Sequence, residues 1–195
     1  MSSKAAATRL NILQKAFELI YKNGYRTTSV DDIIATTQVT KGAFFYHFKN
    51  KDEMGLAMIN EIVYPGMHKA MTEPLANCED PINELYKMMH TLLLEDTFFV
   101  VKYGCPAINL IEEMANYNPG FNTHLMQLSD KWQQAIINCL ENGKASGKIK
   151  PEVSCMQIAN FIIAGYAGVR NLGKMYGKDC YTSYLSELKR YLGTL

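Results

Sequence analysis

The chain has 195 residues, 48% of them hydrophobic and 20% charged, which suits a globular protein with a sizeable core in one or two domains. The most apolar stretch, residues 161–169, is too short to span a bilayer. The N-terminus lacks the continuous apolar run of a signal peptide. We therefore expect a cytoplasmic protein.

The formal net charge of +1 conceals an asymmetry along the chain. Residues 1–51 contain eight Lys or Arg and three Asp or Glu, a net charge of +5, whereas residues 52–195 carry −4. A basic head on a mildly acidic body fits attraction to phosphate at one end only. A chance imbalance would also account for five charges.

The five cysteines are an odd number without a C-x-x-C pair: Cys78, Cys105, Cys139, Cys155 and Cys180. This pattern argues against a disulfide framework and against a zinc site. The four histidines fall on different expected elements without metal-ligand spacing, and no nucleophile elbow, P-loop or dinucleotide fingerprint is present. We therefore expect no metal, no cofactor and no enzymatic activity.

In chain order, a first helix is expected from Thr8 to about Asn23, ended by Gly24. The segment 28–51, TSVDDIIATTQVTKGAFFYHFKNK, then predicts two short helices joined by a tight turn. Ser29 with Asp32 three residues later makes a capping-box start. These elements predict a three-helix unit.

The second short helix, 41–48, begins after the N-cap residue Thr40 and has an unusual composition. Phe44 and Phe48 are four residues apart and point inward, so aromatic, His and Lys side chains cover the rest. We interpret the pair as a helix-turn-helix whose second helix enters a DNA major groove. The alternative, a buried aromatic segment of a helical core, explains the rings but not the basic residues that follow.

The segment TSVDDIIATTQVTKGAFFYHFKNKDEM resembles the DNA-binding signature of TetR/AcrR repressors, T-S-x-x-D-I-A-x-x-A-G-V-S-K-G-x-L-Y-Y-H-F-x-S-K-E-x-L. The resemblance covers about the first sixty residues and implies a two-domain helical homodimer that represses transcription until an effector binds. Gln38 stands where the family has a turn glycine, which predicts a strained positive φ at that residue. Phe45 replaces the frequent tyrosine.

Base contacts are expected from the start and the outer face of the second helix, where Lys41 can bond guanine and Phe45 can meet thymine methyls. Gly42 lets the helix lie close to DNA. By resemblance, other positions hold phosphates or direct a helix N-terminus at the backbone. The predicted DNA-contact residues are Ser29, Thr40, Lys41, Gly42, Ala43, Phe45, Tyr46, His47 and Lys51.

The remaining pattern predicts an all-α fold of about nine helices, with residues 1–51 as the helix-turn-helix domain and 52–195 as a helical ligand-binding and dimerisation domain. A fourth helix starts at Lys51, and Pro65-Gly66 is expected to kink or break it. By resemblance, the last helices, near 154–175 and 181–192, form the dimer interface. Ordinary packing within one chain would use their small residues equally well.

The segment around Gly104-Cys105 resembles a branch similar to the N-ethylmaleimide-reductase repressor, in which a cysteine here responds to electrophiles or oxidants. The resemblance places Lys174 near that cysteine. The alternative is that Cys105 is a small buried residue at a helix start. An effector pocket is expected from Met and aromatic residues, each of which also suits a core: Met88, Met89, Phe98, Phe99, Met114, Tyr117, Met126, Trp132 and Tyr166.

These observations together predict a TetR-type repressor that binds a palindromic operator as a dimer and is released by a small-molecule or electrophile signal. The alternative is a DNA-binding protein of the same fold that acts through a protein partner without a small-molecule effector.

Overall fold

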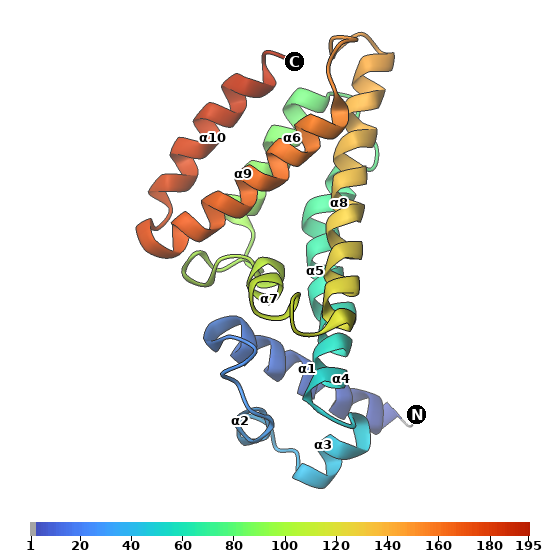
Figure 1. Cartoon of the computed structure of the whole chain (residues 1–195), viewed down its shortest axis with the longest axis vertical. Helices are drawn as coiled ribbons and strands as arrows, with labels where there is room; N and C mark the ends of the chain where they lie inside the picture. Colours follow the sequence, from blue (N-terminus) through green and yellow to red (C-terminus); the bar gives the residue numbers. More distant parts are fainter. Residues whose placement is uncertain (1–2) are drawn as a thin grey trace. The chain divides into compact units, whose positions relative to one another are not determined.

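The structure, a computed structural model, describes residues 3–195, which are helical and contain no strand (Figure 1). The α-helices are α1 Ser3–Asn23, α2 Val30–Ala35, α3 Lys41–His47, α4 Lys51–Met58, α5 Tyr64–Met67, α6 Pro81–His90, α7 Pro106–Met114, α8 Pro119–Ala145, α9 Cys155–Tyr176 and α10 Asp179–Leu192. The π-helical segment Ile59–Val63 joins α4 to α5 without a break, so the described chain forms nine helices, as predicted. None of the described helices is long and apolar enough to cross a membrane.

The chain packs into two compact units, each built from two stretches of sequence. The first consists of Met1–Pro65 with Pro106–Met126, and the second of Gly66–Cys105 with Gln127–Leu195. Helix α7 and the first turns of α8 therefore belong with the N-terminal helices. The functional division predicted at residue 51 stays a prediction, because packing alone defines these units.

In the first unit, α1 ends at Gly24, whose φ of +95° is the left-handed conformation that glycine adopts without strain. The chain that follows is held by α7. The Glu113 carboxylate accepts hydrogen bonds from the backbone N–H of Tyr25 at 3.1 Å and of Arg26 at 2.9 Å. These bonds anchor the corner that leads into α2.

Tyr25 is the buried centre of this corner, with only 2% of its surface exposed. Its ring meets Phe121 edge-on at 4.9 Å, and its hydroxyl donates to Asp52 at 2.7 Å. Burial, reinforced by the Asp52 carboxylate, raises the pKa of Tyr25, so the phenol stays protonated. A side chain at Gly55 would collide with both rings, so this glycine allows α4 to approach them.

In the second unit, α10 packs against α9 and α6 (Figure 1). Gly173 and Gly165 on α9 face the rings of Tyr181 and Tyr184 on α10, where any larger residue would overlap the rings. Gly168, by contrast, has no atom near the position of a side chain. Gly165 and Gly173 thus allow α10 to pack closely against α9, whereas the surface at Gly168 is not covered by the described chain.

Two expectations from the sequence need correction. Of the kink or break expected at Pro65-Gly66, the break is wrong, because α5 runs through both residues between two π-helical segments, Ile59–Val63 and His68–Thr72. Cys78 and Cys139 form a disulfide, with Cα atoms 5.2 Å apart. The two cysteines lie 61 positions apart in sequence, so their spacing held no local sign of the pairing.

Candidate functional site

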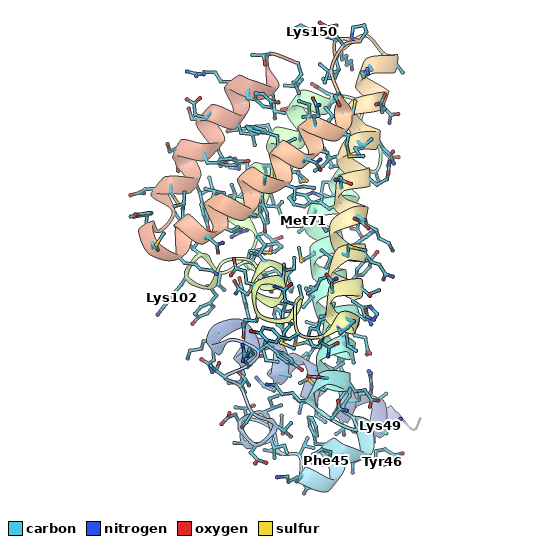
Figure 2. The ribbon with its side chains drawn as sticks, in the orientation of Figure 1. Phe45, Tyr46, Lys49, Met71, Lys102 and Lys150 are labelled. Carbon is cyan, nitrogen blue, oxygen red and sulfur yellow. A yellow bond between two sulfur atoms is a disulfide. The ribbon has the colours of Figure 1, made fainter. Side chains whose placement is uncertain are left out.

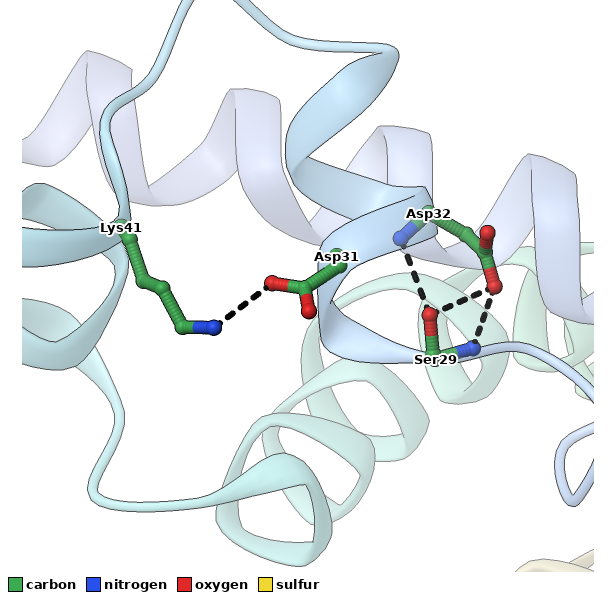
Figure 3. Close-up of polar contacts among 4 residues, drawn as sticks. All are labelled: Ser29, Asp31, Asp32 and Lys41. Atoms are coloured by element: carbon green, nitrogen blue, oxygen red, sulfur yellow. Dashed lines mark hydrogen bonds and ion pairs between the residues drawn. The ribbon is translucent and has the colours of Figure 1, made fainter.

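Helices α2 and α3 form a helix-turn-helix in which side chains cap both N-termini. The Asp32 backbone N–H donates to Ser29 Oγ at 3.0 Å, and the Asp32 carboxylate accepts from the Ser29 backbone N–H at 2.8 Å (Figure 3). This is the predicted capping box. Thr40 Oγ1 accepts from the Ala43 backbone N–H at 3.2 Å and caps α3 as predicted.

The turn between these helices is built without a left-handed residue. The positive φ expected at Gln38 was wrong, because among the described residues only glycines have a positive φ. Instead, the hydroxyls of Thr36 and Thr37 donate to the carbonyls of Ile33 and Ile34 at 2.9 and 3.0 Å. The backbone N–H groups of both threonines donate to the same two carbonyls at 3.1 and 3.0 Å, so α2 ends in hydrogen-bonded turns without a left-handed residue.

The aromatic residues of α3 divide cleanly between its two faces. Phe44 and Phe48 are buried, with ring centroids 5.7 Å apart. Phe45 and Tyr46 are 46% and 75% exposed, and both lie on the outer side of the helix (Figure 2). Because Gly42 has no atom near the position of a side chain, the backbone of α3 is open to close approach there.

The two lysines predicted to contact DNA, Lys41 and Lys51, differ in their interactions within the protein. Lys41 is exposed, and its amine forms an ion pair with Asp31 at 2.9 Å across the motif (Figure 3). The Lys51 amine donates to the Tyr25 carbonyl at 2.5 Å and lies over the Tyr25 ring at 4.3 Å. Desolvation by burial lowers the pKa of Lys51. His47 is half-buried, whereas Lys49, which was not among the predicted contacts, is exposed.

In the second unit, four of the predicted effector residues gather around an arginine that was not among the predicted site residues. Phe99, Cys105, Trp132 and Tyr166 are all buried, and the Trp132 and Tyr166 rings meet edge-on at 5.1 Å. Arg170 follows Tyr166 by one helical turn on α9 and is 0% exposed. Arg170 lies four residues before Lys174 on α9. A charged residue in the apolar part of this helix was the feature of the sequence that could have identified it.

The other predicted effector residues have different surroundings. Met89 is buried, and Met88 lines a surface groove of about 570 Å³ whose walls include charged side chains such as Lys69, Glu73 and Lys87. Met126 is 57% exposed. Met88 therefore borders a groove with charged walls, and Met126 lies at the surface.

Gly104, which precedes Cys105, determines how closely Lys174 approaches the backbone at this point. Its φ is +76°, and the Lys174 side chain occupies the space where a side chain of residue 104 would stand. Two features therefore require glycine at position 104: its positive φ, and the Lys174 side chain that fills the space of a Cβ. Lys174 thus lies against the residue that precedes Cys105.

Cys78, Cys139 and Glu84 bring potential metal-ligand atoms within 4.8 Å of one another. The two sulfurs are joined in the disulfide, and a metal requires free thiolates. The Glu84 carboxylate already accepts bonds from the backbone N–H groups of Glu79 and Asp80. The expectation that the protein binds no metal stays a prediction.

Comparisons with known proteins agree with this geometry. Residues 12–58 match the family model "Bacterial regulatory proteins, tetR family", and residues 58–187 match "Tetracyclin repressor-like, C-terminal domain". An uncharacterised HTH-type transcriptional regulator of Lactococcus lactis is 33% identical over 133 residues, which cover 68% of each chain.

Two further comparisons bear on the branch and on the fold. The HTH-type transcriptional repressor NemR of Escherichia coli is 25% identical over 145 residues, covering 70% of this chain and 69% of that protein, consistent with the predicted branch. A TetR transcriptional regulator from Chloroflexus aurantiacus superposes with a TM-score of 0.87 at 24% identity, over 97% of this chain and 96% of the other. The chain therefore belongs to the TetR family of DNA-binding transcriptional regulators.

Proposed function

We propose that the protein is a repressor that binds a palindromic operator as a homodimer and is released by a small-molecule or electrophile signal in its second unit. The observation that carries the DNA-binding role is the outer face of α3, where Phe45 and Tyr46 are exposed beside Gly42 and Lys41. Exposed rings next to an amine suit a major groove, which offers both thymine methyls and acceptor atoms.

The contacts divide into two kinds. Base edges fall to residues at the start and on the outer face of α3: Thr40, Lys41, Ala43 and Phe45. Phosphates fall to residues around them, together with the N-terminus of α2: Ser29, Tyr46, His47 and Lys51. The ion pair of Lys41 with Asp31 does not prevent Lys41 from binding DNA. Exposed ion pairs contribute at most about 1 kcal/mol, so the Lys41 amine can leave Asp31 for a base edge.

The homodimer is supported by an apolar face of α9. Phe161, Leu172, Met175 and Tyr176 are between 43% and 68% exposed. Their spacing places them on one side of the helix, together with the open position at Gly168. Exposed apolar side chains that share one helix face indicate an association surface. A second copy fits because TetR-family members act as dimers.

The electrophile branch of the proposal rests on Cys105. Cys105 is 1% exposed, so the proposed modification requires local opening of the structure around the thiol. Cys155 is the internal comparison, because burial raises the pKa of its thiol to about 11 and keeps it a neutral, unreactive thiol near pH 7.

Hydroxyl-radical footprinting on an operator selected in vitro tests the repressor role. We expect two protected half-sites about 34–36 Å apart, one helical turn of DNA. A single half-site, or binding without sequence preference, would refute the dimeric operator model.

The signal is tested by mass spectrometry after mild hypochlorite treatment. We expect modification of Cys105 ahead of Cys155 and loss of operator binding that Cys105→Ser prevents. Equal labelling of all free cysteines, or none at Cys105, would count against electrophile sensing and leave the small-molecule effector as the signal.

A further inference from the structure

Arg170 is a buried cation without a counter-ion. Its side chain is 0% exposed, and none of the ion pairs among the described residues includes it. One terminal nitrogen, Nη2, donates to the Leu92 carbonyl, while Nε and Nη1 have no hydrogen-bond partner in the described chain. A single carbonyl compensates little of the desolvation of a guanidinium.

Aromatic rings surround the guanidinium instead. Its central carbon lies 4.8 Å from the centroid of Phe99, 5.3 Å from that of Tyr166 and 5.4 Å from that of Tyr181. These rings offer favourable cation–π contacts, but they leave the N–H groups of Arg170 unsatisfied.

The polar atoms around Arg170 are also without partners. The hydroxyls of Tyr166 and Tyr181 and the indole N–H of Trp132 are buried, and none has a hydrogen-bond partner among the described residues. Both hydroxyls lie close enough to the guanidinium for weak polar contacts with it, and that of Tyr166 also contacts Cys105, but none of these contacts has the geometry of a full hydrogen bond. Native proteins leave few buried polar groups unpaired, and here several donors occur together.

We infer that Arg170, Tyr166, Tyr181 and Trp132 form a binding site for a singly charged carboxylate effector. This inference rests on the proposed function, because it assigns a chemical class to the effector. A carboxylate supplies the acceptor oxygens that every unpaired group here lacks, and its bond to guanidinium is charge-assisted. One arginine balances a single negative charge, whereas a phosphate group carries about −1.5 to −2.

A thermal-shift assay on the purified full-length protein tests this inference. The probes are acetate, hexanoate and benzoate, each compared with its neutral amide at equal concentration and ionic strength. We expect at least one carboxylate to raise the melting temperature where its amide does not. If no carboxylate exceeds its amide, the inference is overturned.

Arg170→Met supplies the matched variant, with Arg190→Met as its control because Arg190 is exposed and pairs with Glu187. Arg170→Met should lose the carboxylate response, with affinity on the order of tenfold weaker or more, while Arg190→Met keeps it. Without ligand, Arg170→Met should melt at or above the wild-type temperature, because it removes an uncompensated buried charge. A lower melting temperature together with an undiminished carboxylate response would show a purely structural arginine.

Two further measurements separate this inference from the proposed function. If Arg170→Met does not fold, Arg170→Lys keeps the charge and should retain part of the response. Operator binding without ligand is measured in parallel, because its failure would refute the repressor role and not the carboxylate site.

Discussion

At the scale of single residues, local rules account for most of the helix-turn-helix. Phe44 on α3 and Phe48, the C-cap residue that follows it, lie four positions apart and are both buried, as predicted from this spacing. Ser29 and Thr40 begin their helices because their side-chain oxygens accept backbone N–H groups of the first turn. Each of these outcomes depends on residues at most four positions apart, so sequence alone was sufficient.

Lys51→Ala should weaken binding to all DNA sequences alike. A phosphate contact has no sequence information, so we expect the slope of log K against log salt concentration to flatten by about one unit. Fluorescence anisotropy over a salt series measures this slope. Because the Lys51 amine also bonds the Tyr25 carbonyl, the fold of the variant is checked by circular dichroism.

Lys41→Ala is the contrasting variant, because Lys41 is assigned to a base edge. It should reduce the preference for the operator over unrelated DNA by about 1–3 kcal/mol. A sequence-selective loss for Lys51→Ala, or a uniform loss for Lys41→Ala, would reverse the two assignments.

Asp32 predicts a pH dependence of stability. The hydroxyl and backbone N–H of Ser29 donate to its carboxylate at 2.6 and 2.8 Å, which holds the pKa of Asp32 below its ordinary value of 3.8. A depressed folded-state pKa stabilises the fold above the ordinary pKa, and this stabilisation is lost as the pH falls through the lowered value.

Asp32→Asn should therefore melt below the wild type near pH 6, and the difference should shrink below about pH 3.8. Circular-dichroism melts over this range measure the difference. A gap between the two proteins that does not change with pH would mean that the carboxylate charge plays no part.

At the scale of elements, the corrections share one cause. The turn after α2 needs no glycine, because none of its residues has a positive φ and both the backbone N–H groups and the hydroxyls of Thr36 and Thr37 donate to its carbonyls. The helix around Pro65 continues, because π-helical segments on both sides change the hydrogen-bond register. Sequence rules for glycine and proline describe the most frequent backbone geometry at turns and helix ends. In this chain, a turn without glycine and a helix through a proline form their hydrogen bonds in a less frequent way.

The disulfide ties the loop before α6 to α8. Its loop of about 61 residues should stabilise the oxidised protein by roughly 4 kcal/mol through the reduced entropy of the unfolded chain. Urea denaturation with and without dithiothreitol measures this difference. Cys139→Ser should remove the dependence on reductant, and Cys180→Ser, which changes a free cysteine, should keep it. Equal midpoints for the wild type in both conditions would contradict the prediction.

At the scale of the whole molecule, the exposed face of α9 predicts how two copies associate. Leu172→Glu places a charge in the middle of this face and should shift the protein to monomers. Light scattering coupled to size exclusion measures the mass, and footprinting should then lose the paired half-sites. Met156→Glu is the control, because Met156 is 50% exposed but lies on another side of α9. A dimer that survives Leu172→Glu would place the interface elsewhere.

The sequence by itself determined the helical class, the capped helix-turn-helix and the basic character of the N-terminal segment, because these depend on neighbours a few positions apart. Only the tertiary structure decided that Cys78 meets Cys139 and that Arg170 is enclosed by rings without a counter-ion. The disulfide joins cysteines 61 positions apart, and the Leu92 carbonyl that Arg170 meets lies 78 positions away, although Tyr166 is only one helical turn from it. Desolvation and pairing arise only when the chain brings those residues together, and no local pattern encodes them.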